Sequence, residues 1–231
     1  MKKLILGLLA VMSLGVVAFA ATAQASEYLC NGKAEACKVL GFNLAAFVLE
    51  DRGVPASVSC PIEGVKSEGS VSGSTGEVTA ATLAGCTPSA TALNLKEEAV
   101  TNGCGTVNSV EAIDLPWKTP ISEGASNDWW ILIEKGTTTQ PGYAITCTTG
   151  GIKITDKCTT SASGEDLLVL SEDLAAEGSE PALLTTIFST SLLKANEAAT
   201  CSLGGVEQGF TSGEILEEGW TGTAAEALAI N

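Results

Sequence analysis

The amino-acid sequence predicts an all-β fold that is mainly antiparallel: a disulfide-stabilised β-sandwich or barrel with one or two short helices. Between residues 58 and 151, apolar and polar residues alternate with a period of two, as in strands with one buried face. Glycine and serine interrupt this alternation roughly every eight to twelve residues, as turns between short strands do. Eight cysteines follow an export leader, and an even number in an exported chain favours disulfide bonds.

Residues 1–25 have the three parts of a secretory signal peptide. Two lysines at positions 2–3 are followed by an apolar run over residues 4–20 and by the small-x-small sequence Ala23-Gln24-Ala25. We therefore expect cleavage before Ser26, which leaves one secreted β-rich domain over residues 26–231. A retained anchor helix is the alternative, since the apolar run approaches the length of a short membrane span.

The mature chain is strongly acidic. Without the two lysines of the leader it has 10 basic and 27 acidic residues, a net charge of −17, and a single arginine, Arg52. Nucleic acids and anionic membrane surfaces are bound through clustered lysine and arginine, so neither is expected as a partner. After signal cleavage we expect a protein with no membrane attachment, extracellular or cell-wall associated, which its charge keeps soluble.

All eight cysteines follow the predicted cleavage site: Cys30, Cys37, Cys60, Cys86, Cys104, Cys147, Cys158 and Cys201. The chain has no histidine and no Cys-x-x-Cys pair, so zinc is the weaker interpretation, and no metal or cofactor is expected. Four disulfides are predicted instead. Closeness in sequence suggests Cys30–Cys37, Cys86–Cys104 and Cys147–Cys158, although sequence alone does not determine the pairing.

Individual elements follow from the same patterns. Strands are predicted over Glu77–Leu83, Leu93–Lys96, Val110–Leu115, Gly142–Cys147 and Gly151–Thr155, the last two joined by a glycine turn. Ala34–Leu40 contains helix formers and is a candidate short helix. Ser179–Lys194 has apolar residues at helical spacing but Thr and Ile at its centre, so helix and strand both remain open.

A short pattern occurs three times, over residues 59–65, 146–152 and 200–206. Each copy has Ser or Thr, then Cys, three residues, Gly and a β-branched residue. We interpret it as a strand that ends in cysteine, a glycine turn and a returning strand. The irregular spacing argues against a solenoid and leaves one sandwich or two small related lobes.

Four phrases resemble segments of a large group of uncharacterised secreted β-rich proteins from soil actinobacteria: Thr82–Cys86, Val110–Thr119, Pro141–Cys147 and Ala199–Val206. They are spread over much of the mature chain, and the likeness is in the order of the phrases. The resemblance implies export and a β-rich fold. It carries over no functional residue, because the group has no assigned activity.

The sequence offers few signs of catalysis. The missing histidine removes most hydrolytic triads and His-ligated metals. Ser191 and Lys194 match the Ser-x-x-Lys pair of penicillin-binding enzymes, but the companion Ser-Asp-Asn and Lys-Thr-Gly elements are absent, which favours coincidence. Glycoside hydrolysis needs only two carboxylates about 5 to 9 Å apart. The acids nearest the tryptophans are Asp114, Glu123, Asp128 and Glu134.

Three of the four tryptophans lie close together in sequence, at Trp117, Trp129 and Trp130. The segment Asp128–Glu134 places Trp129 and Trp130 on opposite faces of a predicted strand whose faces are both mostly apolar, which favours a central strand in the core. Trp117 is expected to be the more exposed ring. Core packing is the preferred interpretation, and a platform for cell-wall or environmental polysaccharide is the alternative.

Together these patterns favour a non-enzymatic secreted or cell-wall-associated β-sandwich protein with a structural or binding role, whose partner the sequence leaves unknown. The alternative is a carboxylate-dependent glycan hydrolase, or a carbohydrate-binding module, that uses the segment from Trp117 to Trp130.

Overall fold

The structure is a computed structural model that describes residues 26–125, 128–134, 140–160, 167–173, 184–188, 199–221 and 224–230; for 122–125, 128–132, 167–173, 184–188, 206–208, 214, 221, 224–226 and 229 it describes the backbone alone. The strands are β1 (Tyr28–Cys30), β2 (Cys37–Asn43), β3 (Phe47–Asp51), β4 (Ala56–Cys60), β5 (Val65–Ser72), β6 (Thr75–Leu83), β7 (Thr87–Pro88), β8 (Ala92–Leu93), β9 (Ala99–Val100), β10 (Thr106–Ile113), β11 (Trp117–Lys118), β12 (Ile121–Ala125), β13 (Asp128–Ile133), β14 (Gly142–Thr149), β15 (Ile152–Thr159), β16 (Leu167–Asp173), β17 (Leu184–Phe188), β18 (Ala199–Cys201), β19 (Gly205–Thr221), β20 (Ala224–Glu226) and β21 (Leu228–Ile230). This confirms the all-β prediction.

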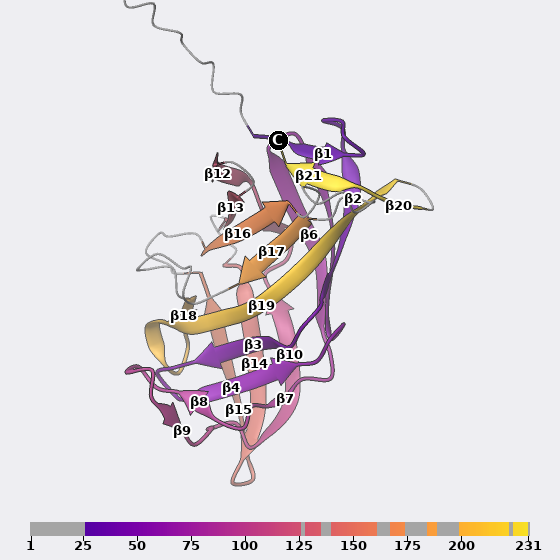
Figure 1. The fold of residues 1–231 in the computed structure, drawn as a ribbon. Coiled ribbons are helices and arrows are strands. Elements are labelled where there is room, and N and C mark those ends of the chain that lie inside the picture. Colours follow the sequence, from indigo (N-terminus) through magenta and orange to yellow (C-terminus); the bar gives the residue numbers. More distant parts are fainter. Residues whose placement is uncertain are drawn as a thin grey trace, which may run out of the picture.

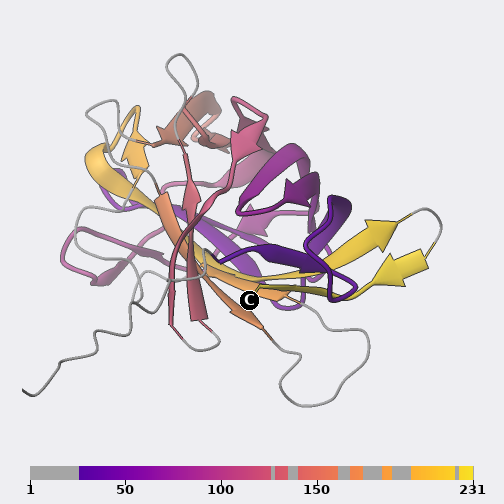
Figure 2. The same cartoon turned by 90° about the horizontal axis from the view of Figure 1, so that it is seen from above.

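The described strand pairs are all antiparallel, as the period-two pattern predicts. One sheet contains 17 of the strands, while β1 pairs with β21 and β8 pairs with β9 in two small sheets. Seen from two directions, the large sheet is curled rather than flat, in the manner of a half-barrel (Figures 1 and 2). The curl gives the sheet an inner face, and the apolar side chains collect there.

Strand β19 connects two parts of the sheet and runs across the molecule in Figure 1. Its residues Gly209–Ser212 pair with β3, and its residues Ile215–Trp220 pair with β2. Between them Gly213 has a φ of +146°, and a Cβ atom there would lie 2.5 Å from the Phe47 ring. A glycine is therefore required where the strand changes partner.

The predicted hairpin over residues 142–155 is confirmed. Strands β14 and β15 pair along their whole length, closing at Thr149 and Ile152. Gly150 and Gly151 have φ angles of 60° and 82°, as a two-residue hairpin turn with both central residues at positive φ requires. The copy of the repeat at 200–206 also joins two paired strands, β18 and β19. In the copy at 59–65 the turn leads from β4 to β5, which pair with other strands instead.

The prediction of a short helix over residues 34–40 is wrong. Strand β2 begins at Cys37, and its side chains alternate between buried positions and more accessible ones. Pairing with β5 on one edge and β19 on the other holds the segment extended, so tertiary context overrides its helix propensity. Of the ambiguous segment 179–194, residues 184–188 form β17, and the rest lie outside the described residues. No helix in the described ranges is long and apolar enough to cross a membrane.

The eight cysteines form four disulfides, as predicted: Cys30–Cys37, Cys60–Cys86, Cys104–Cys147 and Cys158–Cys201. The expected Cys30–Cys37 bond is confirmed, whereas the expected Cys86–Cys104 and Cys147–Cys158 bonds are wrong. The reason is strand register, because the bonds follow neighbours in the sheet rather than neighbours in sequence. Cys158 and Cys201, for example, face each other across β15 and β18.

Buried apolar residues form two clusters on the curled sheet. The larger cluster contains Phe47, Leu49, Val58, Cys60, Val65, Cys104, Val110, Tyr143, Ile145, Cys147, Cys158, Ala199, Cys201 and Ile215. The smaller contains Tyr28, Cys30, Cys37, Val39, Val71, Ile133, Leu228 and Ile230, with Trp117 and Ile121 packed against it. Seven of the eight cysteines thus belong to the two clusters, and the eighth, Cys86, packs against the larger one.

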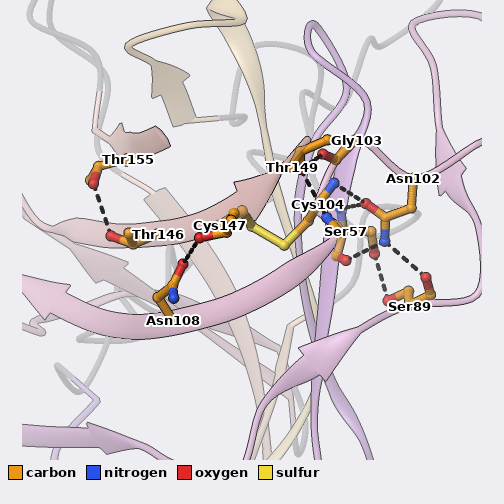
Figure 3. The surroundings of a disulfide bond; sticks show 12 residues. Ser57, Ser89, Asn102, Gly103, Cys104, Asn108, Thr146, Cys147, Thr149 and Thr155 are labelled. Carbon is orange, nitrogen blue, oxygen red and sulfur yellow. Dashed lines mark hydrogen bonds between the residues drawn. A yellow bond between two sulfur atoms is a disulfide. The ribbon is translucent and has the colours of Figure 1, made fainter. Parts of the chain in front are cut away.

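A polar network surrounds the Cys104–Cys147 disulfide and ties β4 to the chain before β10 (Figure 3). Asn102 Nδ2 donates to the backbone oxygens of Ser57 (2.6 Å) and Ser89 (2.8 Å), and Asn102 Oδ1 accepts from the backbone N–H groups of Ser57 (3.1 Å) and Cys104 (2.9 Å). One amide side chain therefore satisfies four backbone groups in a region without regular pairing.

Candidate functional site

The curled sheet surrounds a partly open cavity of about 160 Å³, lined by residues of both core clusters. Strands β2, β3, β5, β6, β10, β14 and β19 all contribute to its wall. The apolar residues that line it include Val39, Leu49, Val65, Val78, Leu83 and Ile215. Because these residues come from strands far apart in the sequence, the cavity exists only in the assembled fold.

A β-bulge in β6 directs apolar residues toward the cavity. The pairing of β5 with β6 shifts register between Glu68 and Gly69, which leaves Thr79 as an extra residue on β6. As a result Val78 and Ala81, three positions apart, both line the cavity, while Thr79 is exposed. Without the bulge, strict alternation would place one of these two side chains on the outer face.

Polar groups mark the end of the cavity near the smaller cluster. Tyr28 is buried, and its hydroxyl group donates to the backbone oxygen of Thr119 at 3.2 Å. Burial, and then the charge of Glu217, raise the pKa of Tyr28, so this hydroxyl stays protonated. Glu217 and Glu77 also line the cavity, and Glu77 Oε1 is 2.6 Å from Lys118 Nζ.

Tyr143 lines the cavity and lies near a pair of buried carboxyl groups. Its hydroxyl group donates to the backbone oxygens of Glu50 (2.7 Å) and Phe210 (3.1 Å), which joins β14 to β3 and β19. Burial raises the pKa of Tyr143 well above its ordinary value, and the nearby charges of Asp51 and Asp156 add to the effect. The wall is therefore a fixed hydrogen-bonded element.

The two carboxyl groups belong to Asp51, at the end of β3, and Asp156, in β15. Asp51 is fully buried, and its Oδ1 accepts from the N–H groups of Gly53 (2.7 Å) and Val54 (3.3 Å). Its Oδ2 is buried and has no hydrogen-bond partner among the described residues. Burial, then the hydrogen bond and charge of Asp156, raise the pKa of Asp51 to about 7.

Asp156 connects the pair to the turn between β18 and β19. Its Oδ1 accepts from Ser202 Oγ at 2.8 Å and from the N–H group of Leu203 at 3.0 Å. The turn also contacts Asp51, since a Cβ atom on Gly204 would overlap the Asp51 carboxyl group. The pair thus holds β3, β15 and the β18–β19 turn together, which is a structural role.

One group of potential metal ligands occurs among the described residues, formed by Asp156, Cys158 and Cys201, whose ligand atoms lie within 4.8 Å of one another. Cys158 and Cys201 are joined in a disulfide, so neither sulfur is available as a thiolate. Asp156 alone is not a metal site. The described residues therefore offer no set of ligands that fits a metal ion.

The three tryptophans predicted as a possible platform lie in different strands. Trp117, expected to be exposed, is half-buried; it lines the cavity, packs against the smaller cluster and donates from Nε1 to the backbone oxygen of Ile113 at 2.8 Å. Trp129 and Trp130 lie in β13, which pairs with β12 and β16 and is thus a central strand, as predicted. Their side chains lie outside the description, so a shared platform stays a prediction.

The acids proposed for hydrolysis are spread over several elements. Asp114 follows β10, and its Oδ2 accepts from the N–H group of Gln140 at 2.9 Å. The N–H group of Glu134 donates to the backbone oxygen of Lys118 at 2.9 Å. The described backbone places Glu123 in β12 and Asp128 in β13, while Ser191 and Lys194 lie outside the described residues.

Sequence reasoning missed Asp51, Asp156 and the cavity. The only local signal for Asp51 is the sequence Asp51-Arg52-Gly53, which is typical of a side chain that accepts from the backbone two residues on. Its partner Asp156 lies more than a hundred positions away, and nothing in the sequence links the two. Comparison with known proteins gives no match to a family model, to a curated protein or to a solved structure.

Proposed function

We propose that this protein is exported and binds a small apolar molecule in the cavity of its curled sheet, without catalysing a reaction. The cavity itself carries the proposal. Its volume of about 160 Å³ is close to that of an engineered apolar cavity, about 150 Å³, which stays dry and takes up benzene. A ligand of this size would lose most of its contact with water, at a gain of about 25 cal/mol for each Å² of apolar surface buried.

The disulfides support a site of action outside the cell. Four disulfides are typical of proteins that work in an oxidising environment. We propose that residues 1–25 are removed and that the mature protein acts outside the cell or at the cell wall. Protein recovered from the culture medium should begin at Ser26 on N-terminal sequencing. A chain that keeps Met1 and sediments with membranes would contradict this.

Two features favour binding over catalysis. The chain contains no histidine, the most common general acid and base. The described carboxyl group with a raised pKa, that of Asp51, is also 0% exposed and lies near the buried Tyr143. A general acid must come within hydrogen-bonding distance of its substrate, and a group buried in this way does not.

Carbohydrate binding or glycan hydrolysis by the segment from Trp117 to Trp130 stays a second prediction. Incubation with cell-wall and plant polysaccharides should release no reducing sugar and leave tryptophan fluorescence unchanged if the apolar cavity is the functional site. Release of sugar would replace the binding proposal with the hydrolase.

Binding in the cavity can be tested with two neighbouring alanines of β6. Ala81 lines the cavity, whereas Ala80 is exposed on the other face. The oxidised wild-type protein should bind toluene or indole, measured by titration calorimetry and by ligand-detected NMR. Ala81→Leu adds three carbons inside the cavity and should abolish binding. Ala80→Leu adds the same carbons outside it and should leave binding unchanged.

Thermal melting of both variants controls for folding. The proposal fails if wild-type protein binds neither probe, or if folded Ala81→Leu protein binds as tightly as Ala80→Leu protein.

A further inference from the structure

We infer that one edge of β15 is a docking site for an extended, acidic segment of another protein, which joins the sheet there as an added strand. Residues 152–157, which form this edge, do not line the cavity, so the inference does not depend on the proposed function. It rests on the backbone groups of the edge, on an apolar hollow beside them and on two exposed lysines. Addition of a strand to an open sheet edge is a recurring way of binding peptides.

Strand β15 uses its other edge to pair with β14. Because a two-residue turn closes this hairpin at Ile152, the backbone groups of Ile152 and of every second residue after it bond to β14. The backbone groups of Lys153 and Thr155 therefore point away from β14. Lys157, two residues further on, shows the same direction. Its N–H group donates to Ser202 Oγ at 3.0 Å, and its backbone oxygen accepts from the Ser202 N–H group at 2.8 Å.

No described strand covers this edge beside Lys153 and Thr155. Strand β18 reaches β15 only at Cys158 and Thr159. Among the described residues, two N–H groups and two backbone oxygens are thus left for an added strand, in the arrangement that antiparallel pairing needs. The turn between β14 and β15 lies at the lower end of the molecule in Figure 1, so an incoming segment can approach from outside.

An apolar hollow of about 70 Å³ adjoins β15. Val54, Ile154 and Leu203 line it, and each is between 42% and 48% exposed. The Cys104–Cys147 disulfide also lines the hollow, and Ile152, on the same face of β15 as Ile154, is 65% exposed. Apolar side chains gathered at a surface are typical of an interaction site. An added strand would direct every second side chain to this face, so those side chains should be apolar.

The opposite face of β15 determines the charge of the partner. Lys153 and Lys157 alternate with the isoleucines and are exposed there. Neither lysine takes part in a described ion pair, although the mature chain has 27 acidic residues against 10 basic ones. In an antiparallel pair, directly opposed side chains lie on the same face, and opposite charges at such positions attract. The partner segment should therefore alternate acidic and apolar residues.

A second copy of the chain fits this edge less well. Antiparallel pairing of β15 with β15 would bring Lys153 and Lys157 of both copies together, and like charges on neighbouring strands are destabilising. An acidic segment of a different protein avoids this repulsion and neutralises both lysines.

Two short peptides test the proposal, one in which glutamate and valine alternate over seven residues and one with lysine in place of each glutamate. They are titrated into oxidised protein in about 0.15 M salt, which screens distant charges. We expect the glutamate peptide to bind at least about tenfold more tightly. Non-specific attraction would give the opposite order, because the mature protein has a net charge of −17.

Matched variants locate the binding site. Lys153→Gln combined with Lys157→Gln should remove the preference for the glutamate peptide. Lys38→Gln combined with Lys66→Gln makes the same change of charge at exposed positions of β2 and β5, and should keep the preference. Thermal melting of both double variants controls for folding.

Methylation of peptide nitrogens separates strand pairing from charge attraction. In the proposed pairing the glutamates lie opposite Lys153 and Thr155, so their N–H groups bond to β15. A peptide N-methylated at its glutamates should not bind, whereas one N-methylated at its valines should bind like the unmodified peptide. The amide hydrogens of Lys153 and Thr155 should exchange rapidly in the free protein and more slowly with the glutamate peptide bound.

Several results would overturn the inference. The lysine peptide could bind as tightly as the glutamate peptide, the glutamate peptide could fail to bind at up to about 1 mM, or the two methylated peptides could bind equally. Gel filtration could instead show a dimer in which the amides of Lys153 and Thr155 are already protected, because a second copy then covers the edge. The measurements do not involve the cavity, so they leave the proposed function to its own test.

Discussion

Replacing Asp51 by asparagine should remove most of a pH dependence that the fold itself creates. Asp51 is fully buried, and its carboxyl group faces Asp156. The nearby guanidinium of Arg52 does not neutralise it, because Arg52 contacts Glu50 (3.5 Å), Glu97 (3.2 Å) and the Phe210 ring (4.0 Å) instead. The pKa of Asp51 is therefore raised to about 7, from an ordinary value of 3.8, by burial first and then by Asp156.

The sign follows from proton uptake. Between pH 4 and pH 7 the folded protein holds a proton on Asp51, and the unfolded chain does not. The stabilising effect is complete below about pH 4 and is lost as the pH rises through about 7. Each pH unit across this window corresponds to about 1.4 kcal/mol, so the free energy of unfolding should fall by up to about 4 kcal/mol.

Urea denaturation of oxidised protein at each pH from 4 to 8, followed by tryptophan fluorescence, measures the effect. Asp51→Asn keeps an oxygen that accepts from the Gly53 N–H group and offers Asp156 an N–H donor. Its free energy of unfolding should therefore change less with pH than that of the wild type and should exceed the wild-type value at pH 8. Glu111→Gln, an exposed change of the same chemistry, should follow the wild-type profile and accounts for the general repulsion among the acids. Wild-type stability that stays constant or increases from pH 4 to 7, or an unchanged slope in Asp51→Asn, would refute the reasoning.

Three further stability changes can be measured by the same denaturation assay at pH 6. Replacing Cys158 and Cys201 together by serine opens a cross-link between residues 43 positions apart and should cost about 4 kcal/mol; a loss below 1 kcal/mol would contradict a constrained unfolded state. Asn102→Ala removes four hydrogen bonds and should cost about 2 to 4 kcal/mol, whereas stability equal to wild type would mean that water replaces the amide fully. Gly213→Ala combines an unfavourable φ with a clash against Phe47 and should cost at least about 1 to 3 kcal/mol, so an unaffected protein would show that β19 can shift there.

Local patterns predicted the parts of the fold that local residues determine. The β14–β15 hairpin could be placed because two glycines and the flanking alternation specify both the turn and the register. The segment 34–40 could not, because its extended form depends on β5 and β19, which are distant in sequence. The same limit explains the disulfides: an even number of cysteines in an exported chain predicts four bonds, but Cys104 meets Cys147 because Cys104 lies just before β10, which pairs with β14.

The candidate site was less predictable than the fold. A period of two predicts which residues face inward, but the bulge at Thr79 shifts this alternation by one residue. No single residue in the sequence indicates where the bulge lies. Whether inward-facing side chains fill the interior or leave a space depends on how strands from the whole chain curl around it. Trp117 was recognised as notable, yet its place on the cavity wall depends on Tyr28 and the rest of the smaller cluster.

The free-energy cost of the cavity can be compared with the stability that the disulfides add. A closed, empty apolar cavity destabilises a protein by about 24 cal/mol per Å³, so a volume of about 160 Å³ costs up to about 4 kcal/mol. A disulfide across 43 residues contributes about the same amount, and the chain has two of them. A fold cross-linked in this way can keep a space that a tightly packed core would close. At a given ratio of ligand concentration to Kd, a ligand in the cavity adds the same increment to the free energy of unfolding of both proteins, so this increment is a larger fraction of the total in protein that lacks the Cys158–Cys201 bond.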